Sequence, residues 1–279
     1  MRLTAHLEMK YLPTGHFFGE TNRIIRLSGI TLTDTEYTHA KVDWHFHENA
    51  YFTFILHGKL IEGNKKESYN CTGGSLLFHS WQEPHYNVKP EGYTRGFHIE
   101  FDDGWFERFY LDKNKLEGSF KIENPDIKLL LYKIYRETKI CGEAMIVSLE
   151  ALLLETIAQL IRAGEMTASK KPLWVNKLRE LLHDRYAEKH TLENLSGELS
   201  IHPVHLSRDF SKYFHCTLGE YIRKIRIEKA LSVLSNKNLS LTDIAFDCGF
   251  ADQSHFLRCF KNINGATPSE YRKLLKLDS

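Results

Sequence analysis

The sequence predicts two domains. The first is an all-β domain followed by a helical segment, and the second is an all-α domain with two helix-turn-helix motifs. Three observations carry this prediction. The chain has 279 residues, which is long for one domain and sufficient for two. Its hydrophobic pattern changes from strand-like to helical near Asn124. A six-residue pattern occurs as HLSRDF at 205–210 and as HFLRCF at 255–260.

Residues 1–118 are predicted to form the all-β domain. The segments 44–60, 73–80 and 94–101 are rich in aromatic and β-branched residues, and glycine-containing turns separate them. Many short strands with such punctuation are typical of a compact barrel or sandwich.

Residues 119–166 are predicted to form two helices. Asn124 is the expected cap of the first helix and Pro125 its first residue. Apolar residues then recur at helical spacing as far as Ile161, and Gly142 and Gly164 are expected to end the two helices. The apolar stripe either packs on the barrel or forms a dimer interface. The polar segment 167–172 is the expected domain boundary.

Residues 172–279 are predicted to be helical throughout. Thr191 caps a short helix, and Pro203 starts the next one after a break at 200–202. Leu206 and Phe210 lie four residues apart and face inward. Two helices joined by such a short turn form a helix-turn-helix. A second copy follows near 241–260, with Gly249 in the turn, and a long helix from 218 to 236 connects the copies.

The outer faces of the two second helices carry similar polar residues, namely His205, Ser207, Arg208 and Lys212 in the first copy and Gln253, His255 and Arg258 in the second. Arginine binds the O6 and N7 edge of guanine, glutamine binds adenine, and a helix fits the major groove. A lone arginine there would be read as a solvated surface residue. Because Arg208 and Arg258 occupy the same place in two motifs, the pattern favours base recognition.

Residues 183–276 strongly resemble the AraC-type bacterial transcription regulators, above all in the stretch LSLTDIAFDCGFADQSHFLRCFKNINGATPSEYRK at 239–273. The resemblance implies two helix-turn-helix motifs that bind successive major-groove segments of promoter DNA. It implies that the family's base-reading positions fall on Val204, Ser207, Arg208, Gln253, Ser254 and Arg258. With the neighbouring His205, Lys212, His255 and Lys261 these residues form the expected DNA-binding set. Val204 is a departure, because an apolar residue there can contact only a thymine methyl group.

The N-terminal domain carries a second candidate site. His45 and His47 lie two apart on a strand and so point to one side, and His85 follows a later strand. Imidazoles bind Zn, Fe, Cu or Ni. The segments around these residues resemble the two motifs of the cupin barrel that AraC-type regulators often carry as a sensor. Cupins have a glutamate where Tyr51 or Phe52 stands here. Glu48, Glu83 and His79 are the neighbouring candidates for a fourth ligand.

Two interpretations of the barrel remain open. His45, His47 and His85 bind a divalent metal, or they form hydrogen bonds in a barrel that holds a small organic effector near Tyr51. Aromatic residues that could line such a pocket, or belong to the core, are Trp44, Phe46, Trp81 and Tyr86.

Composition bounds the remaining possibilities. The chain has a net charge of +1, but residues 172–279 hold 16 Lys and Arg against 13 Asp and Glu, a weak indication of nucleic-acid binding. Five cysteines without a CxxC pair indicate a reduced, cytoplasmic protein. No apolar run near 18 residues is apparent, so no membrane span is expected. No catalytic motif is recognisable, so the protein is expected not to be an enzyme.

The prediction is a cytoplasmic transcription regulator. The expected partners are promoter DNA, a small effector and a second copy of the chain, and RNA polymerase is a further candidate. The family resemblance favours activation. Two alternatives are a metal-dependent cupin enzyme fused to a DNA-binding domain, and a constitutive DNA-binding protein whose barrel is structural.

Overall fold

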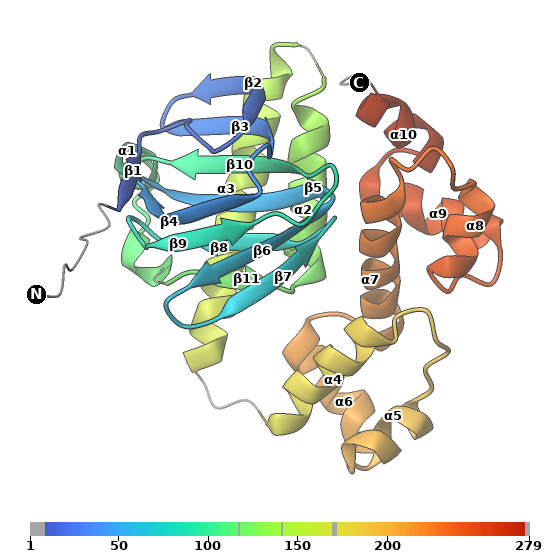
Figure 1. The fold of residues 1–279 in the computed structure, drawn as a ribbon. Coiled ribbons are helices and arrows are strands. Elements are labelled where there is room, and N and C mark those ends of the chain that lie inside the picture. Colours follow the sequence, from blue (N-terminus) through green and yellow to red (C-terminus); the bar gives the residue numbers. More distant parts are fainter. Residues whose placement is uncertain (1–8, 117, 141, 169–171, 277–279) are drawn as a thin grey trace, which may run out of the picture. The chain divides into compact units, whose positions relative to one another are not determined.

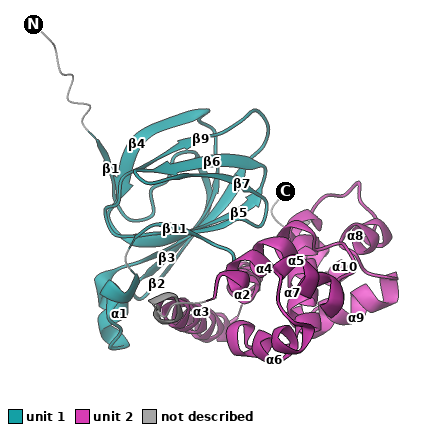
Figure 2. Cartoon of the chain, turned by 90° about the horizontal axis from the view of Figure 1, so that it is seen from below, with its two compact units in different colours: residues 1–123 teal, residues 124–279 magenta. Residues whose placement is uncertain are grey.

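The computed structural model describes residues 9–276 apart from 117, 141 and 169–171. The chain divides into two compact units, residues 1–123 and 124–279 (Figure 2). The first unit holds all the described strands, and the second is helical. The predicted two-domain fold class is therefore confirmed.

Unit 1 consists of two β-sheets (Figures 1 and 2). One has the strand order β1-β4-β9-β6-β7, and the other has the order β11-β8-β5-β10-β3-β2. The strands are β1 (Lys10–Leu12), β2 (Glu20–Leu27), β3 (Ile30–Glu36), β4 (Lys41–His47), β5 (Ala50–His57), β6 (Lys59–Asn64), β7 (Ser68–Thr72), β8 (Leu76–His79), β9 (His85–Val88), β10 (Arg95–Phe101) and β11 (Phe120–Ile122). Helix α1 (Asp103–Arg108) and a 3₁₀ turn (Lys113–Leu116) lie between β10 and β11.

The boundary of the barrel lies slightly beyond the predicted residue 118. Strand β11 pairs antiparallel with β8, with Phe120 opposite Phe78 and Ile122 opposite Leu76. The barrel therefore continues to Ile122. The predicted segment 44–60 is also not one strand, because a turn at Glu48 and Asn49 separates β4 from β5.

Unit 2 consists of nine helices within the described residues. They are α2 (Pro125–Glu137), α3 (Ala144–Ala168), α4 (Leu173–Asp184), α5 (Leu192–Leu199), α6 (Pro203–Phe214), α7 (Leu218–Val233), α8 (Leu241–Asp247), α9 (Gln253–Asn264) and α10 (Pro268–Lys276). Helices α5 and α6 form the first predicted helix-turn-helix and α8 and α9 the second, with α7 between them (Figure 1).

Helix α2 begins as predicted, and α3 is longer than predicted. The Asn124 side chain accepts a hydrogen bond from the backbone N–H of Asp126 and so caps α2. Gly142 precedes α3, but Gly164 lies inside it, since one glycine in a helix costs only about 1 kcal/mol relative to alanine. The expected boundary at 167–172 falls partly on residues 169–171, which lie outside the described residues.

Within the described residues, one helical stretch, Ala144–Gly164, is long and apolar enough by length and composition to cross a membrane. No such run was expected from the sequence, and that expectation was wrong. Glu150 and Glu155 interrupt the apolar residues, but the mean hydropathy of the stretch stays high. Core helices of soluble proteins pass the same test, and Leu149, Leu153 and Ile157 of α3 are fully buried.

The structure explains why the sequence repeats Thr, Glu and Tyr beside each hexamer. Glu220 accepts hydrogen bonds from the backbone and hydroxyl of Thr217, and Glu270 does the same for Thr267. These are capping boxes at the starts of α7 and α10. Tyr221 and Tyr271, one residue after each glutamate, are both buried. The sequence repeat therefore corresponds to one structural unit that occurs twice in the chain.

Helix α2 packs against the helices of the repeated unit. The ammonium group of Lys224 in α7 lies 2.7 Å from a carboxylate oxygen of Asp126. The Tyr271 hydroxyl of α10 donates a 2.6 Å hydrogen bond to the backbone carbonyl of Tyr132. The predicted separation of a 119–166 segment from the C-terminal domain therefore does not correspond to the two compact units, since α2 and α3 belong with the latter.

Candidate nucleic-acid interface and barrel site

The first candidate recognition helix is α6. His202 caps it, and Pro203 is its first residue. Leu206, Phe210 and Phe214 recur at a spacing of four and are buried, which turns the opposite face of α6 outward. That face carries the exposed residues Val204, His205, Ser207, Arg208 and Lys212, all predicted to contact DNA.

The turn before the second candidate recognition helix depends on Gly249. Its φ is +80°, and a Cβ there would lie 2.5 Å from the backbone oxygen of Ala187. Both facts require glycine. In α9, which follows, Phe256 and Phe260 are buried.

The polar residues of α9 divide into two groups. Ser254, Arg258 and Lys261 are exposed, whereas Gln253 and His255 are half-buried. The Gln253 side-chain oxygen accepts a hydrogen bond from the Thr242 hydroxyl, and the His255 ring packs edge-on against Phe250 at 5.4 Å. Ser254, Arg258 and Lys261 are therefore exposed on α9, whereas Gln253 and His255 contact other residues of the second motif.

Arg208 and Arg258 differ in their surroundings despite their equivalent positions. Arg208 donates hydrogen bonds to both carboxylate oxygens of Asp209, at 2.8 and 3.1 Å, and lies 3.2 Å from Nδ1 of His205. Residue 259, the equivalent of Asp209, is a cysteine, and within the described part of the chain Arg258 has no ion pair. In the absence of DNA, only the first arginine therefore has an anionic partner on its own helix.

In unit 1 the three predicted histidines lie together inside the barrel. His45 and His47 of β4 and His85 of β9 are 2–3% exposed, and His45 pairs directly with His85 across the two strands. Ring nitrogens of all three lie within 4.8 Å of one another. His45 Nδ1 lies 2.9 Å from the carbonyl of Asp43, and His85 Nδ1 lies 3.2 Å from that of Glu83. Each ring can therefore donate from Nδ1 and keep a lone pair on Nε2.

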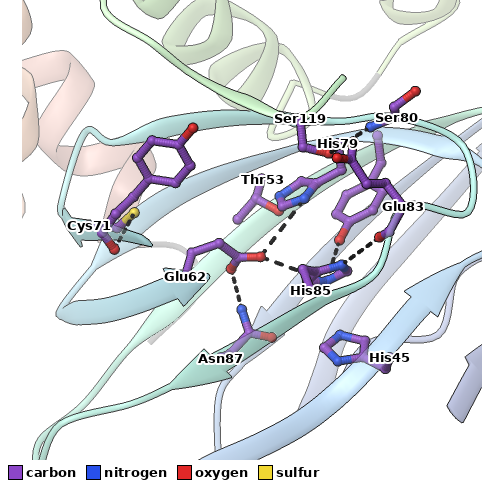
Figure 3. Close-up of polar contacts among 12 residues, drawn as sticks. His45, Thr53, Glu62, Cys71, His79, Ser80, Glu83, His85, Asn87 and Ser119 are labelled. Atoms are coloured by element: carbon purple, nitrogen blue, oxygen red, sulfur yellow. Dashed lines mark hydrogen bonds and ion pairs between the residues drawn. The ribbon is translucent and has the colours of Figure 1, made fainter. Parts of the chain in front are cut away.

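Two further ligand-type residues, Glu62 of β6 and His79 of β8, lie beside His85 (Figure 3). Glu62 is 3% exposed and accepts a short hydrogen bond from the Asn87 amide. Burial raises the pKa of the Glu62 carboxyl well above its usual range. Burial also lowers the pKa of His79, and it lowers the pKa of His85 to about 3, so both rings are neutral.

His79 was one of three neighbouring candidates predicted for a fourth ligand, whereas Glu62 was not among the predicted residues. A signal for Glu62 existed: it shares strand parity with the buried Leu60, which places a carboxylate on the inward face of β6. The other two candidates, Glu48 and Glu83, make hydrogen bonds to residues outside the cluster. Glu48 is exposed and accepts hydrogen bonds from Thr14, and Glu83 accepts one from the Ser119 hydroxyl.

Tyr51, one of the two residues predicted to stand where cupins have a glutamate, faces the interior. Its hydroxyl lies 2.9 Å from His85 Nε2, and its ring stacks on His79. His98 of β10 is a further buried histidine, between the Tyr37 and Thr53 hydroxyls, and Phe17 stacks on its ring at 3.7 Å. The space beside these groups is a cavity of about 10 Å³.

Most of the aromatic residues expected to line a pocket lie elsewhere. Trp44 and Phe46 alternate with His45 and His47 along β4, so they point to the opposite face. Trp44 is 40% exposed and packs on Tyr86, and Trp81 packs on Phe106 of α1. These four residues therefore do not line the cavity beside the histidines, and Trp81 lines a separate pocket together with Ser80 and Lys113.

Comparison with known proteins identifies one part of the chain. Residues 195–274 match the family model described as "Helix-turn-helix domain". The chain is 34% identical over 105 residues to the "Bifunctional transcriptional activator/DNA repair enzyme AdaA" of Bacillus subtilis, covering 38% of this chain and 50% of AdaA. It is 22% identical over 243 residues to the "Uncharacterized HTH-type transcriptional regulator YisR" of the same species, covering 80% and 85%.

A structure of ToxT from Vibrio cholerae is 17% identical, with 88% of this chain and 97% of that chain covered and a TM-score of 0.38. The first curated relatives are matched over about half their length, 50% for AdaA and 44% for the Escherichia coli regulator YijO. The matched family model covers both helix-turn-helix motifs and both candidate recognition helices. Residues 195–274 are therefore a helix-turn-helix domain of the matched family.

Proposed function

We propose that the protein is a sequence-specific transcription regulator that binds promoter DNA through α6 and α9. The observation that carries this proposal is the repeated outward face of the two helices. Each has buried aromatic residues on one side and an exposed arginine at the same position on the other. Two recognition helices held by one domain suit two successive major-groove segments.

The proposed contacts follow from side-chain chemistry. Arg208 and Arg258 bind guanine edges, and Val204 contacts a thymine methyl group. Lys212 and Lys261, near the C-terminal ends of α6 and α9, bind phosphates without sequence preference. The remaining members of the predicted set are His205, Ser207, Gln253, Ser254 and His255.

The regulatory half of the proposal concerns the barrel and α3. A small effector binds in the interior near His45, His47, His85 and Tyr51, and alters DNA binding because its affinity differs between two states of the protein. Helix α3 exposes Ile146 and Val147, by 50% and 71%, which favours pairing with α3 of a second copy. On this proposal the protein is a cytoplasmic homodimer, and RNA polymerase is its partner in activation.

A metal-dependent enzyme is the second candidate, and the buried histidine cluster is the observation that favours it. The curated relatives that support the regulator are named mainly as transcription regulators. We therefore infer that the chain is not an enzyme. Turnover in a screen of the metal-loaded full chain, lost on replacing His85, would favour the enzyme instead.

The main experiment is genomic footprinting with and without candidate effectors, followed by binding of the purified full chain to the recovered fragments. Arg258→Ala is expected to lower affinity for its own site and relax preference at one base pair. Lys261→Ala, three residues further along the exposed face of α9, is the matched control. It should weaken binding to all sequences alike and reduce the slope of log K against log salt by about one. Equal losses on all sequences for Arg258→Ala would contradict base recognition.

A further inference from the structure

The barrel interior holds buried polar atoms that the chain leaves without hydrogen bonds. Among the described residues, Glu62 Oε1, His47 Nδ1 and both ring nitrogens of His79 have no hydrogen-bond partner. Buried polar atoms are nearly always paired in folded proteins, and exceptions often mark an ion or ligand that is absent. Three of the four atoms belong to Glu62 and His79, which are adjacent.

The distances around Glu62 suit donors to one ion better than hydrogen bonds. Glu62 Oε1 lies 3.7 Å from His85 Nε2 and 3.8 Å from His79 Nδ1 (Figure 3). Both distances exceed hydrogen-bond range. Two donors held about 2.1 Å from one ion at a tetrahedral angle lie ~3.4 Å apart. Small rotations of these side chains therefore bring all three atoms into one coordination shell.

The charge of Glu62 also favours a bound cation at this cluster. Glu62 is 3% exposed, and within the described part of the chain no Lys or Arg forms an ion pair with it. A buried carboxylate without a cation is unfavourable, and so is a divalent cation bound only by neutral rings. His45, His47 and His85 alone would leave such a cation uncompensated. Glu62 supplies the anion that the predicted set of three histidines lacks.

We propose that Glu62, His79 and His85 form a binding site for a divalent transition-metal ion of the Zn²⁺ class. Two imidazoles and one carboxylate are a common donor set for such ions. The contact of His85 Nδ1 with a backbone carbonyl orients its Nε2 toward the ion, as in many metal sites. The cavity of about 10 Å³ in the barrel interior is lined by Glu62 and His85, and also by His45 and His47, and it has room for an ion or a water molecule.

The test measures metal binding by the full chain without DNA, so its outcome is independent of the proposed regulatory function. Metal-free protein is titrated with Zn²⁺ against a chromophoric chelator, and Co²⁺ loading is followed by visible absorption. One equivalent is expected, without a cobalt–thiolate charge-transfer band, since no cysteine belongs to the site. Glu62→Gln and His79→Gln are each expected to lower Zn²⁺ affinity at least 100-fold.

The rival ligand set provides the control. His45→Gln and His47→Gln are expected to change Zn²⁺ affinity less than tenfold. Zn²⁺ should raise the melting temperature of the wild type and not that of Glu62→Gln, which also reports whether the variant folds. Loss of binding in the His45 and His47 variants but not in Glu62→Gln would overturn the proposal. Absence of stoichiometric Zn²⁺ binding by the wild type would overturn it as well.

Discussion

Lys128 of α2 and Glu228 of α7 face each other across a helix interface, with their charged atoms 4.0 Å apart and their side chains 3% and 1% exposed. A fully buried ion pair contributes little net stability, but it penalises any arrangement that leaves one charge alone. This pair therefore ties α2 to the central helix between the two helix-turn-helix motifs.

The first prediction follows from this pair. Lys128→Met and Glu228→Leu should each destabilise the protein by up to about 3–5 kcal/mol, because each removes one partner of a buried ion pair. The loss should be smaller for Lys128→Met, because Lys229 lies 4.0 Å from the other carboxylate oxygen of Glu228. The double variant Lys128→Met/Glu228→Leu should recover most of that loss. Denaturant unfolding of the four proteins gives the coupling free energy. Additive losses in the double variant would mean that the two side chains act separately.

The second prediction concerns the turn of the second motif. Gly249→Ala should destabilise the protein by more than ~1 kcal/mol, because φ is +80° and the added Cβ would meet the backbone of Ala187. Gly197→Ala in α5 is the matched control. A Cβ there has no atom within 4 Å, so this change should stabilise the helix by about 0.5–1 kcal/mol. Equal effects of the two changes would contradict the role of the turn.

The helical half of the fold was predictable because its signals are local. Caps at Asn124 and Thr191 and a proline at the start of α6 mark helix ends within a few residues of sequence. The strands β1, β2, β3, β7, β9 and β11 and most of β6 were not predicted. β2 lies at a sheet edge, where exposed polar residues weaken the alternation, and β3 is buried on both faces.

The barrel site was predictable only in part, because convergence of residues from different strands depends on sheet register. The spacing of His45 and His47 fixed their common side, and pairing of β4 with β9 placed His85 opposite His45. Glu62 reaches the same interior because β6 pairs with the other edge of β9. No sequence pattern links β6 to β9, so the carboxylate of the site could not be assigned before the register was known.

The third prediction concerns pH. Burial lowers the pKa of His98 to about 3, whereas an unfolded histidine titrates near 6.5. Below pH 6.5 the unfolded chain therefore binds a proton that the folded chain does not, so His98 reduces stability as pH falls. Relative to His98→Gln, the wild type should lose about 2 kcal/mol of unfolding free energy between pH 7.5 and 5.

Denaturant unfolding of metal-free protein at several pH values measures this difference. Burial also raises the pKa of Glu100 to about 7, which acts in the opposite direction, but both proteins share that group. His39→Gln, at an exposed position, controls for the loss of a histidine as such. A difference between wild type and His98→Gln that stays constant with pH would show that His98 does not titrate in this way.

The fourth prediction concerns competition for His85. The Tyr51 hydroxyl, 2.9 Å from His85 Nε2, donates to the lone pair that the proposed metal ion needs. Tyr51→Phe keeps the ring that stacks on His79 and removes this hydrogen bond. Zn²⁺ affinity should then rise about 2- to 10-fold, the equivalent of one net hydrogen bond. Weaker binding by Tyr51→Phe would instead make the Tyr51 oxygen a ligand.

The last prediction concerns the two arginines. Asp209 holds the Arg208 guanidinium through two hydrogen bonds, whereas Arg258 has a cysteine as its neighbour at the equivalent position. To contact a base, Arg208 must leave Asp209. Asp209→Asn should therefore raise affinity for the specific site, by up to about fivefold for an exposed pair. In an Arg208→Ala background that specific gain should vanish, and only a uniform, salt-dependent gain from the lost negative charge should remain. Titration of the operator and its single-base variants separates the two effects. A loss of specific affinity in Asp209→Asn would mean that Asp209 holds Arg208 in its DNA-binding position.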